Sequence, residues 1–139
     1  MASSATQWKA TGPFPHFTSA LHVVDYVKRK YPDVHLSFYD TSSGNHANLS
    51  MIDVPKRMQR QGVGSNIMKA INHYADSSGK TVTLTPEYRG YGQPSKFKLV
   101  QFYKQHGYRS NLGRKRDYRY SGTMIRVPTK SLEVRRPLD

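Results

Sequence analysis

The residues with the clearest chemical pattern form a glycine turn near the middle of the chain, Gln59-Arg60-Gln61-Gly62-Val63-Gly64. A short apolar stretch precedes this turn, and an amphipathic helical pattern follows it. The first N–H groups of a helix lack intrahelical acceptors, and the helix dipole gives them partial positive charge. Glycine residues let the backbone approach an anion closely. The pattern therefore predicts a phosphate-binding turn, with an ordinary strand-to-helix connection as the alternative.

Two common phosphate motifs do not match this turn. The GxxxxGK[ST] spacing of a P-loop is absent, and a dinucleotide fingerprint needs a third glycine where Ile67 stands. The turn matches the form Q/R-x-x-G-x-G/A, and it resembles the pyrophosphate loop of the GCN5-related N-acetyltransferase (GNAT) superfamily. The segment LVQFYKQHGY, residues 99–108, resembles the second signature of that family, a Phe-Tyr helix closed by glycine and an aromatic residue. The resemblance covers roughly residues 45–110.

The resemblance implies an α+β fold with αβα layers. We expect a mixed, mostly antiparallel central sheet with splayed strands and with helices on both faces. It also implies the residues that would bind acetyl-CoA: the main chain of Ile52 and Val54, the amides of Gln59, Arg60, Gln61, Gly62, Val63 and Gly64, Ser65 at the helix start, and Ser95 or Lys96 in place of a family asparagine. The Val54 N–H is the expected oxyanion donor. Many members have glycine where this chain has Arg60, so we expect an added cation and an ordinary backbone conformation there.

Acetyl transfer to an amine needs a proton for the departing thiolate, and Tyr103 is the candidate acid. It occupies the tyrosine position of the Phe-Tyr helix in the family pattern. Its ordinary pKa near 10 lies above that of a thiol, so it keeps its proton until the thiolate forms. The alternative is a core aromatic residue in register with Phe97 and Val100.

The sequence does not single out a general base. Some relatives place a glutamate early in the strand before the loop, but this chain has Asn48 there, which accepts no proton at neutral pH. The candidate substitutes are Asp53, His46, Glu87 and a chain of water molecules. His46 has a suitable ordinary pKa but lies beside a turn, whereas Asp53 is equally compatible with a solvent-facing or arginine-paired position.

Length and composition fit a small enzyme domain. With 139 residues and no cysteine, the chain predicts a single core, no disulfide and a direct acyl transfer rather than a cysteine relay. The six histidines show no metal-ligand spacing, so we expect no metal. We predict an N-terminal arm over 1–15, one domain over 16–127 and a basic tail over 128–139. Because neither a signal-peptide pattern nor a long apolar run is visible, we expect a soluble, cytoplasmic protein without membrane contact.

The chain is strongly basic, with 22 Lys and Arg residues against 9 Asp and Glu residues and a formal net charge of +13. Nine basic and two acidic residues lie between Arg109 and Arg136, a net of +7. This excess indicates contact of the region 109–136 with RNA or DNA, and a solvated basic surface is the alternative. A nucleic-acid-binding module is therefore a rival function, with stacking on tyrosines 88, 91, 108, 118 and 120.

Apolar spacing also predicts the main elements. A helix should begin at Thr18 or Ser19, bury Leu21, Val24, Val27 and Tyr31, and stop at Pro32. Strands are expected over 34–39, 47–54 and 81–85, and one or two more within 118–127. Helices should run from residue 63 to a left-handed cap at Gly79, and from Ser95 to residue 106.

These patterns together predict a GNAT-type N-acetyltransferase that uses acetyl-CoA directly. The expected acceptor is a primary amine on a protein lysine, a protein N-terminus or a nucleic acid. A homodimer is compatible with such a chain. Besides the nucleic-acid-binding module, a GNAT fold that has lost catalysis and acts by protein binding is an alternative, and Asn48 is the only feature that points to it.

Overall fold

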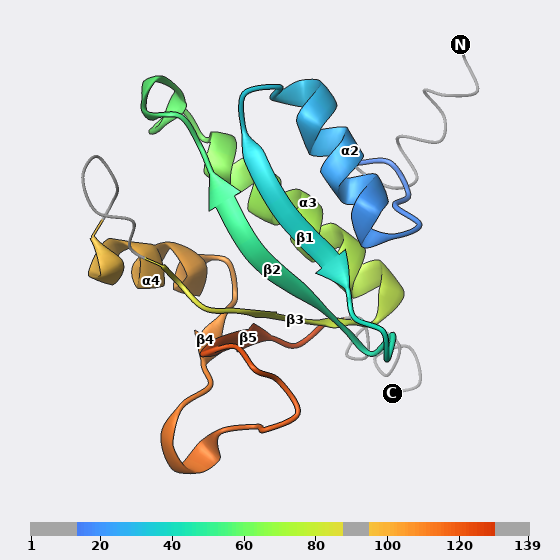
Figure 1. The fold of residues 1–139 in the computed structure, drawn as a ribbon, viewed down its shortest axis with the longest axis vertical. Coiled ribbons are helices and arrows are strands. Elements are labelled where there is room, and N and C mark those ends of the chain that lie inside the picture. Colours follow the sequence, from blue (N-terminus) through green and yellow to red (C-terminus); the bar gives the residue numbers. More distant parts are fainter. Residues whose placement is uncertain (1–13, 88–94, 130–139) are drawn as a thin grey trace, which may run out of the picture.

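The computed structural model describes residues 14–87 and 95–129, and Figure 1 shows their arrangement. The chain forms α2 (Ala20–Lys30), β1 (His35–Asp40), β2 (His46–Asp53), a 3-10 turn (Lys56–Met58), α3 (Val63–Ser78), β3 (Thr81–Leu84), α4 (Lys96–Gln105), β4 (Arg109–Ser110), a second 3-10 turn (Gly113–Lys115) and β5 (Met124–Arg126). Within the described residues, no helix combines the length and apolar character needed to cross a bilayer.

The strands form one mixed sheet in the order β1-β2-β3-β5-β4. Only β2 and β3 run parallel, and the other neighbours are antiparallel. Helix α3 connects the parallel pair, because a parallel connection needs a long crossover. The observed sheet confirms the predicted α+β class and the predicted mixed, mostly antiparallel sheet.

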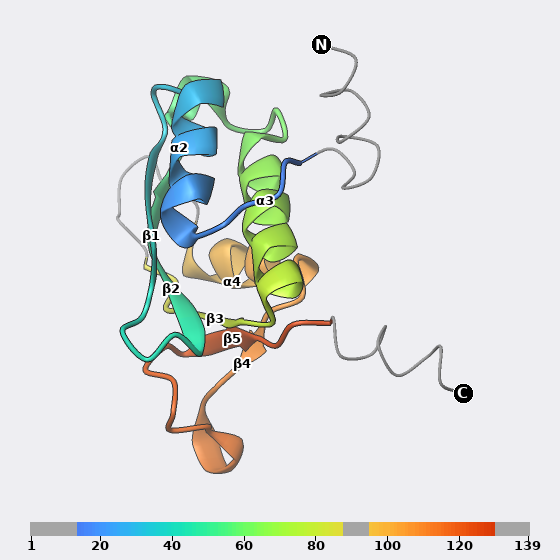
Figure 2. The same ribbon diagram turned by 90° about the vertical axis from the view of Figure 1, so that its right-hand side faces the viewer.

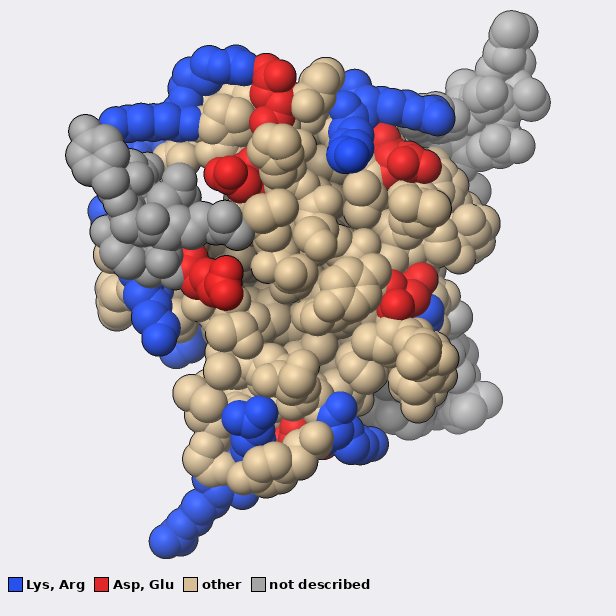
Figure 3. Space-filling view, viewed as in Figure 1, with Lys and Arg blue, Asp and Glu red and all other residues tan. Residues whose placement is uncertain are grey.

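The described helices lie on the same side of β1 and β2, as Figures 1 and 2 show. Burial alternates along β1, where Leu36 and Phe38 are buried and Tyr39 is 47% exposed. The outward face of these two strands forms the largely uncharged centre of Figure 3. Within the described residues, the helices that cover this half of the sheet therefore lie on one of its faces.

Helix α2 begins where the sequence predicts, but it buries a different stripe. The Ser19 side chain accepts a hydrogen bond from the His22 N–H and caps the first turn. The buried positions are Ala20, Val23 and Val27, while Leu21 is 67% exposed, so the prediction that Leu21 is buried is wrong. The face at spacing i, i+3 and i+7 meets β1 and α3, and Leu21 points away from both.

Helix α3 confirms the predicted apolar stripe and the predicted cap. Its buried residues are Val63, Ile67, Met68, Ala70, Ile71, Tyr74 and Ala75. Gly79 follows the helix with φ 69°, in the left-handed region that favours glycine. The stripe joins the hydrophobic core from Val63 to Ala75, so one face of α3 is buried over most of the helix.

The C-terminal strands differ from the prediction. Residues 118–122, expected to form a strand, lie in a long loop between β4 and β5. The buried Asn111 side chain holds this loop, because its Oδ1 accepts from the Asp117 N–H (2.7 Å) and its Nδ2 lies 3.1 Å from the Gly122 carbonyl oxygen. These bonds satisfy backbone groups that a strand would have paired with a neighbour.

The folded core extends to Phe14, which is 6% exposed and packs against the rings of Phe17, Tyr26 and His73. The predicted arm over 1–15 therefore includes one residue, Phe14, that packs in the core. Residues 1–13, the loop with Tyr88 and Tyr91, and the tail from 130 onward lie outside the described residues, so those predictions stay predictions.

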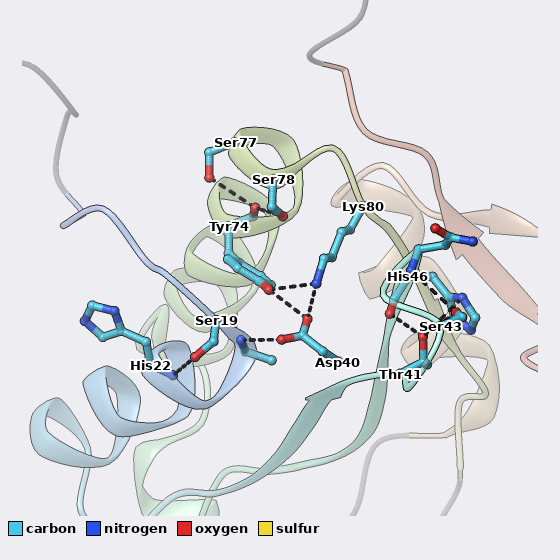
Figure 4. Close-up of polar contacts among 12 residues, drawn as sticks. Ser19, His22, Asp40, Thr41, Ser43, His46, Tyr74, Ser77, Ser78 and Lys80 are labelled. Carbon is cyan, nitrogen blue, oxygen red and sulfur yellow. Dashed lines mark hydrogen bonds and ion pairs between the residues drawn. The ribbon is translucent and has the colours of Figure 1, made fainter.

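A polar cluster joins β1 to the C-terminal end of α3 and to the start of α2 (Figure 4). The Asp40 carboxylate accepts hydrogen bonds from Tyr74 Oη (2.7 Å), Lys80 Nζ (2.8 Å) and the Ala20 N–H (3.1 Å). Burial alone would raise the pKa of Asp40, but the bonds from Lys80, Tyr74 and Ala20 outweigh burial and lower it. One carboxylate thus links three elements.

We expect Asp40→Asn to lower the free energy of unfolding by about 1–3 kcal/mol at neutral pH, because the charge-assisted bonds are lost. A lowered folded-state pKa stabilises the fold above the unfolded-state pKa, and that stabilisation disappears as the pH falls through the folded-state pKa. The difference between wild type and variant should therefore shrink below about pH 4. Urea unfolding of both proteins at several pH values measures this difference in the free energy of unfolding.

Asp33→Asn is the matched control, since the ion pair of Asp33 with Arg57 has both side chains more than half exposed. An exposed pair contributes about 0–1 kcal/mol. Equal losses in the two variants would contradict the linking role of Asp40.

Candidate active site

Strands β2 and β3 separate in the middle of the sheet. Their parallel pairing runs from His46 opposite Thr81 to Leu49 opposite Leu84 and then stops. Strand β2 continues to Asp53 along β1 alone, and the β1–β2 register shifts by one residue so that Ser50 has no partner. An extra residue bends a strand and increases its twist. The far half of β2 therefore presents an edge towards β3 that no strand occupies.

A cavity lies in the opening between the separated strands. From β2 it is lined by Leu49, Ser50, Met51 and Ile52, from β3 and the segment after it by Leu84, Thr85 and Glu87, and from α4 by Leu99 and Tyr103. The site therefore combines an unpaired strand edge with side chains from α4. The predicted contact residue Ile52 lies in this lining, and Val54 follows β2 by one residue.

Tyr103 is the titratable side chain that α4 brings to this cavity. It is 6% exposed, and its ring packs edge-on against Phe102 and Tyr108. Burial raises the pKa of Tyr103 to about 12. No hydrogen bond to its hydroxyl is made by the residues that the structure describes, so the proton is available to a group in the cavity.

The core-aromatic alternative for Tyr103 placed it in register with Phe97 and Val100, and Val100 is partly buried against the core. Phe97 is 71% exposed, whereas Tyr103 is buried. Tyr103 does pack against the hydrophobic core, so burial and cavity contact coexist in one residue.

The glycine turn opens α3 as predicted. Gly62 is the N-cap residue, with φ 80° and no side-chain cap, and no acidic residue lies in the first turn. The first hydrogen bond along the helix runs from the Asn66 N–H to the Gly62 carbonyl. The N–H groups of Val63, Gly64 and Ser65 therefore have no acceptor within the helix, and the turn from Arg60 to Gly62 is exposed. This is a positive helix terminus open to an anion.

The side chains of the turn hold its shape. Gln59 Nε2 donates to the Val54 carbonyl (3.0 Å), which ties the turn back to the end of β2. Gln61 Nε2 donates to the Arg57 carbonyl (3.0 Å). A Cβ atom at Gly64 would lie 3.3 Å from the Phe102 ring, so this glycine allows α4 to approach α3. Gly64 therefore brings the glycine turn into contact with the Phe-Tyr helix.

The candidate bases lie in different places. His46 begins β2, beside Thr41 and the ring of Tyr120, and Asp53 ends the same strand, about 23 Å away at the usual rise per residue. Neither residue lines the cavity, whereas Glu87 does. Asn48, at the family's glutamate position, donates to Tyr39 Oη (2.7 Å) on the outward face. Of the named side chains, Glu87 alone shares the cavity with Tyr103.

The two substitutes for the family asparagine lie at the start of α4. Ser95 is the N-cap residue, and its side chain accepts from the Lys98 N–H (3.2 Å). Lys96 is the first helical residue and is exposed. Within residues 14–87 and 95–129, no three His, Asp or Glu side chains gather as they would around a metal ion.

No protein-family model matches the sequence, and no curated protein matches it. Among solved structures, the chain is similar to the anti-CRISPR protein AcrVA5, with 18% identity and a TM-score of 0.50 over 66% of this chain and 86% of AcrVA5. It is also similar to Ard1 from Thermoplasma volcanium (18% identity, TM-score 0.48, 88% of this chain and 87% of Ard1). A third similarity is to Chaetomium thermophilum Naa20 in complex with a bisubstrate analogue (14% identity, TM-score 0.47, 96% of this chain and 86% of Naa20).

The similarity to AcrVA5 supports a shared fold. The three described helices and the mixed five-stranded sheet are consistent with the GNAT fold. The chain has the GNAT fold, which confirms the fold that the sequence resemblance implied.

Arg60 corrects one expectation about the turn. Its φ is 65°, in the left-handed region, so the predicted ordinary conformation is wrong. The turn keeps the backbone shape that glycine would adopt more easily, and a side chain in this region costs about 1–2 kcal/mol. Strain of this kind concentrates at functional sites.

We expect Arg60→Gly to raise the free energy of unfolding by about 1 kcal/mol, because glycine adopts the left-handed region without the Cβ clash. Lys56→Gly removes the same charge four residues earlier, at a residue without positive φ, and should give no gain. Urea unfolding of both variants measures the difference, and a loss of stability in Arg60→Gly would contradict the strain.

Proposed function

We propose that the protein is a GNAT-type N-acetyltransferase that moves an acetyl group from acetyl-CoA directly to a primary amine. One observation carries this proposal: the open edge of β2 and Tyr103 line one cavity, and the uncapped start of α3 is tied to the end of β2 by the Gln59–Val54 hydrogen bond and contacts α4 at Gly64. A strand edge takes an extended polar chain, a helix terminus takes phosphate, and a buried phenol supplies a proton.

The residues present fit coenzyme A. The uncapped first turn of α3 and its exposed glycine would hold the pyrophosphate on the amides from Arg60 to Ser65, with the Arg60 guanidinium as a further cation. The edge of β2 at Ile52 and Val54 would hold the pantetheine arm through main-chain hydrogen bonds. When bound, the cofactor supplies an acetyl thioester at the cavity.

The reaction forms a C–N bond and breaks the C–S bond, while one proton leaves the amine and one reaches the sulfur. Tyr103 donates the second proton. Burial raises the pKa of Tyr103 to about 12, so the hydroxyl keeps its proton until the thiolate forms. The Val54 N–H would stabilise the developing oxyanion at the end of β2.

Glu87 takes the first proton in this proposal. It is exposed at the rim of the cavity, on the segment after β3, where an amine would enter. An exposed carboxylate can remove a proton through a water molecule and return it to solvent. His46 and Asp53 lie outside the cavity lining, so the proposal gives them no role.

Tyr103→Phe should lower kcat for thiol release by about a hundredfold and leave acetyl-CoA binding nearly unchanged, because only the proton donor is removed. A thiol-specific reagent follows CoA release, and calorimetry measures binding. Tyr31→Phe is the control for loss of a phenol away from the cavity, where Tyr31 Oη accepts from Asn66. Equal rates in wild type and Tyr103→Phe would refute the acid role.

Glu87→Gln should lower kcat/KM and flatten its pH dependence, with the largest loss above the acidic limb of the profile, because the variant lacks the carboxylate that would take the amine proton. The pH profile of thiol release measures this change, and a matched His46→Gln profile should keep the wild-type shape. If His46→Gln instead removed the acidic limb, the base assignment would move to His46.

A further inference from the structure

The loop between β4 and β5 is a folded protrusion. It extends away from the sheet in both ribbon views (Figures 1 and 2). Besides its bonds to Asp117 and Gly122, the buried Asn111 Nδ2 lies 3.4 Å from the Tyr120 carbonyl oxygen. One side chain thus fixes three points of the loop. We call residues 109–123, which comprise β4 and the loop that follows it, the basic loop.

The basic loop concentrates unpaired positive charge. It carries five cations and one acid, a net of +4: Arg109, Arg114, Lys115, Arg116, Arg119 and Asp117. Arg119 pairs with Asp117, whereas the other four cations form no ion pair within the described residues. Figure 3 shows Lys and Arg side chains at the lower end of the molecule, where Figure 1 draws this loop.

Aromatic rings lie between these cations. The Arg116 guanidinium lies 5.2 Å from the centroid of the Tyr118 ring, and the Arg119 guanidinium lies 5.5 Å from that of Tyr120. Tyr118 is nevertheless 81% exposed. Arg116 Nε is buried and has no hydrogen-bond partner in the structure. The loop therefore offers an exposed aromatic ring, Tyr118, beside Arg116, which forms no ion pair within the described residues.

We propose that the basic loop binds single-stranded nucleic acid. Phosphates would contact the four unpaired cations, and an unstacked base would stack on Tyr118. An acidic peptide would use the cations but would gain little from an exposed tyrosine ring between them. A duplex keeps its bases stacked and could not occupy the ring in this way.

The loop ends beside the cavity. The Gly122 N–H donates to Thr83 Oγ1 (2.9 Å), and the Thr123 N–H donates to Thr85 Oγ1 (3.2 Å). Leu84 and Thr85 line the cavity. A Cβ atom at Gly122 would lie 2.5 Å from the Leu84 carbonyl oxygen, so the loop is held tightly against β3. If the proposed acetyl transfer holds, a bound strand could carry the acceptor amine, but the binding itself does not depend on it.

Fluorescence anisotropy with a short labelled oligouridylate tests the proposal on the full chain. Tyr118→Ala should weaken binding at least about fivefold, and Tyr118→Phe, which keeps the ring, should retain it. Arg114→Gln/Lys115→Gln should reduce the slope of log K against log salt by about 1.4, because two phosphate contacts are lost. Lys28→Gln/Lys30→Gln on α2 is the charge-matched control and should change neither value.

Three outcomes would overturn the proposal: equal weakening in both double variants, no effect of Tyr118→Ala, or tighter binding of polyglutamate or a duplex than of the single strand. The matched oligodeoxynucleotide shows whether RNA or DNA binds better. Acetyl-CoA calorimetry on Tyr118→Ala separates the two proposals, since that variant should bind acetyl-CoA like wild type. If the wild type bound oligouridylate but released no thiol from acetyl-CoA, only the acetyltransferase proposal would be refuted.

Discussion

The loss of pairing between β2 and β3 beyond Leu49 and Leu84 is the feature on which the rest of the site depends. Backbone N–H and C=O groups at a sheet edge need hydrogen-bond partners. Here the edge of β2 faces a cavity instead of a strand. The unpaired Ser50 bends β2 away from β3, and α4 places Tyr103 across the opening. The same geometry also fixes where phosphates would lie, because the Gln59 side chain holds the glycine turn to the end of β2.

The two halves of the sheet have different structural roles. The half with β1 and β2 is anchored by the Asp40 cluster and supplies the open edge. The half with β4 and β5 supports the basic loop and fastens it to β3 through Thr83 and Thr85. A charged protrusion and a polar cavity therefore share β3.

Local patterns predicted most of the scaffold. The caps at Ser95 and Gly79, the stripe of α3 and the turn at Gly62 depend on a few neighbouring residues, and the sequence revealed them. The left-handed φ of Arg60 and the loop around Asn111 depend on contacts between distant residues, which apolar periodicity does not report. Leu21 was misplaced because two overlapping stripes of α2 are apolar and only tertiary contacts choose between them. The shared cavity of Glu87 and Tyr103 likewise became visible only once the fold was known.

The central claim is that the exposed amides around Gly62 hold the pyrophosphate of coenzyme A beside the opening between β2 and β3. Isothermal titration calorimetry with acetyl-CoA tests it most directly, comparing wild type with Gly62→Glu and Gly62→Asn. Asparagine tolerates the left-handed φ of 80° and adds no charge, so it controls for backbone strain. The account predicts binding to wild type and to Gly62→Asn, and loss of binding in a folded Gly62→Glu variant. Equal affinity in all three proteins, or no binding to wild type, would contradict it.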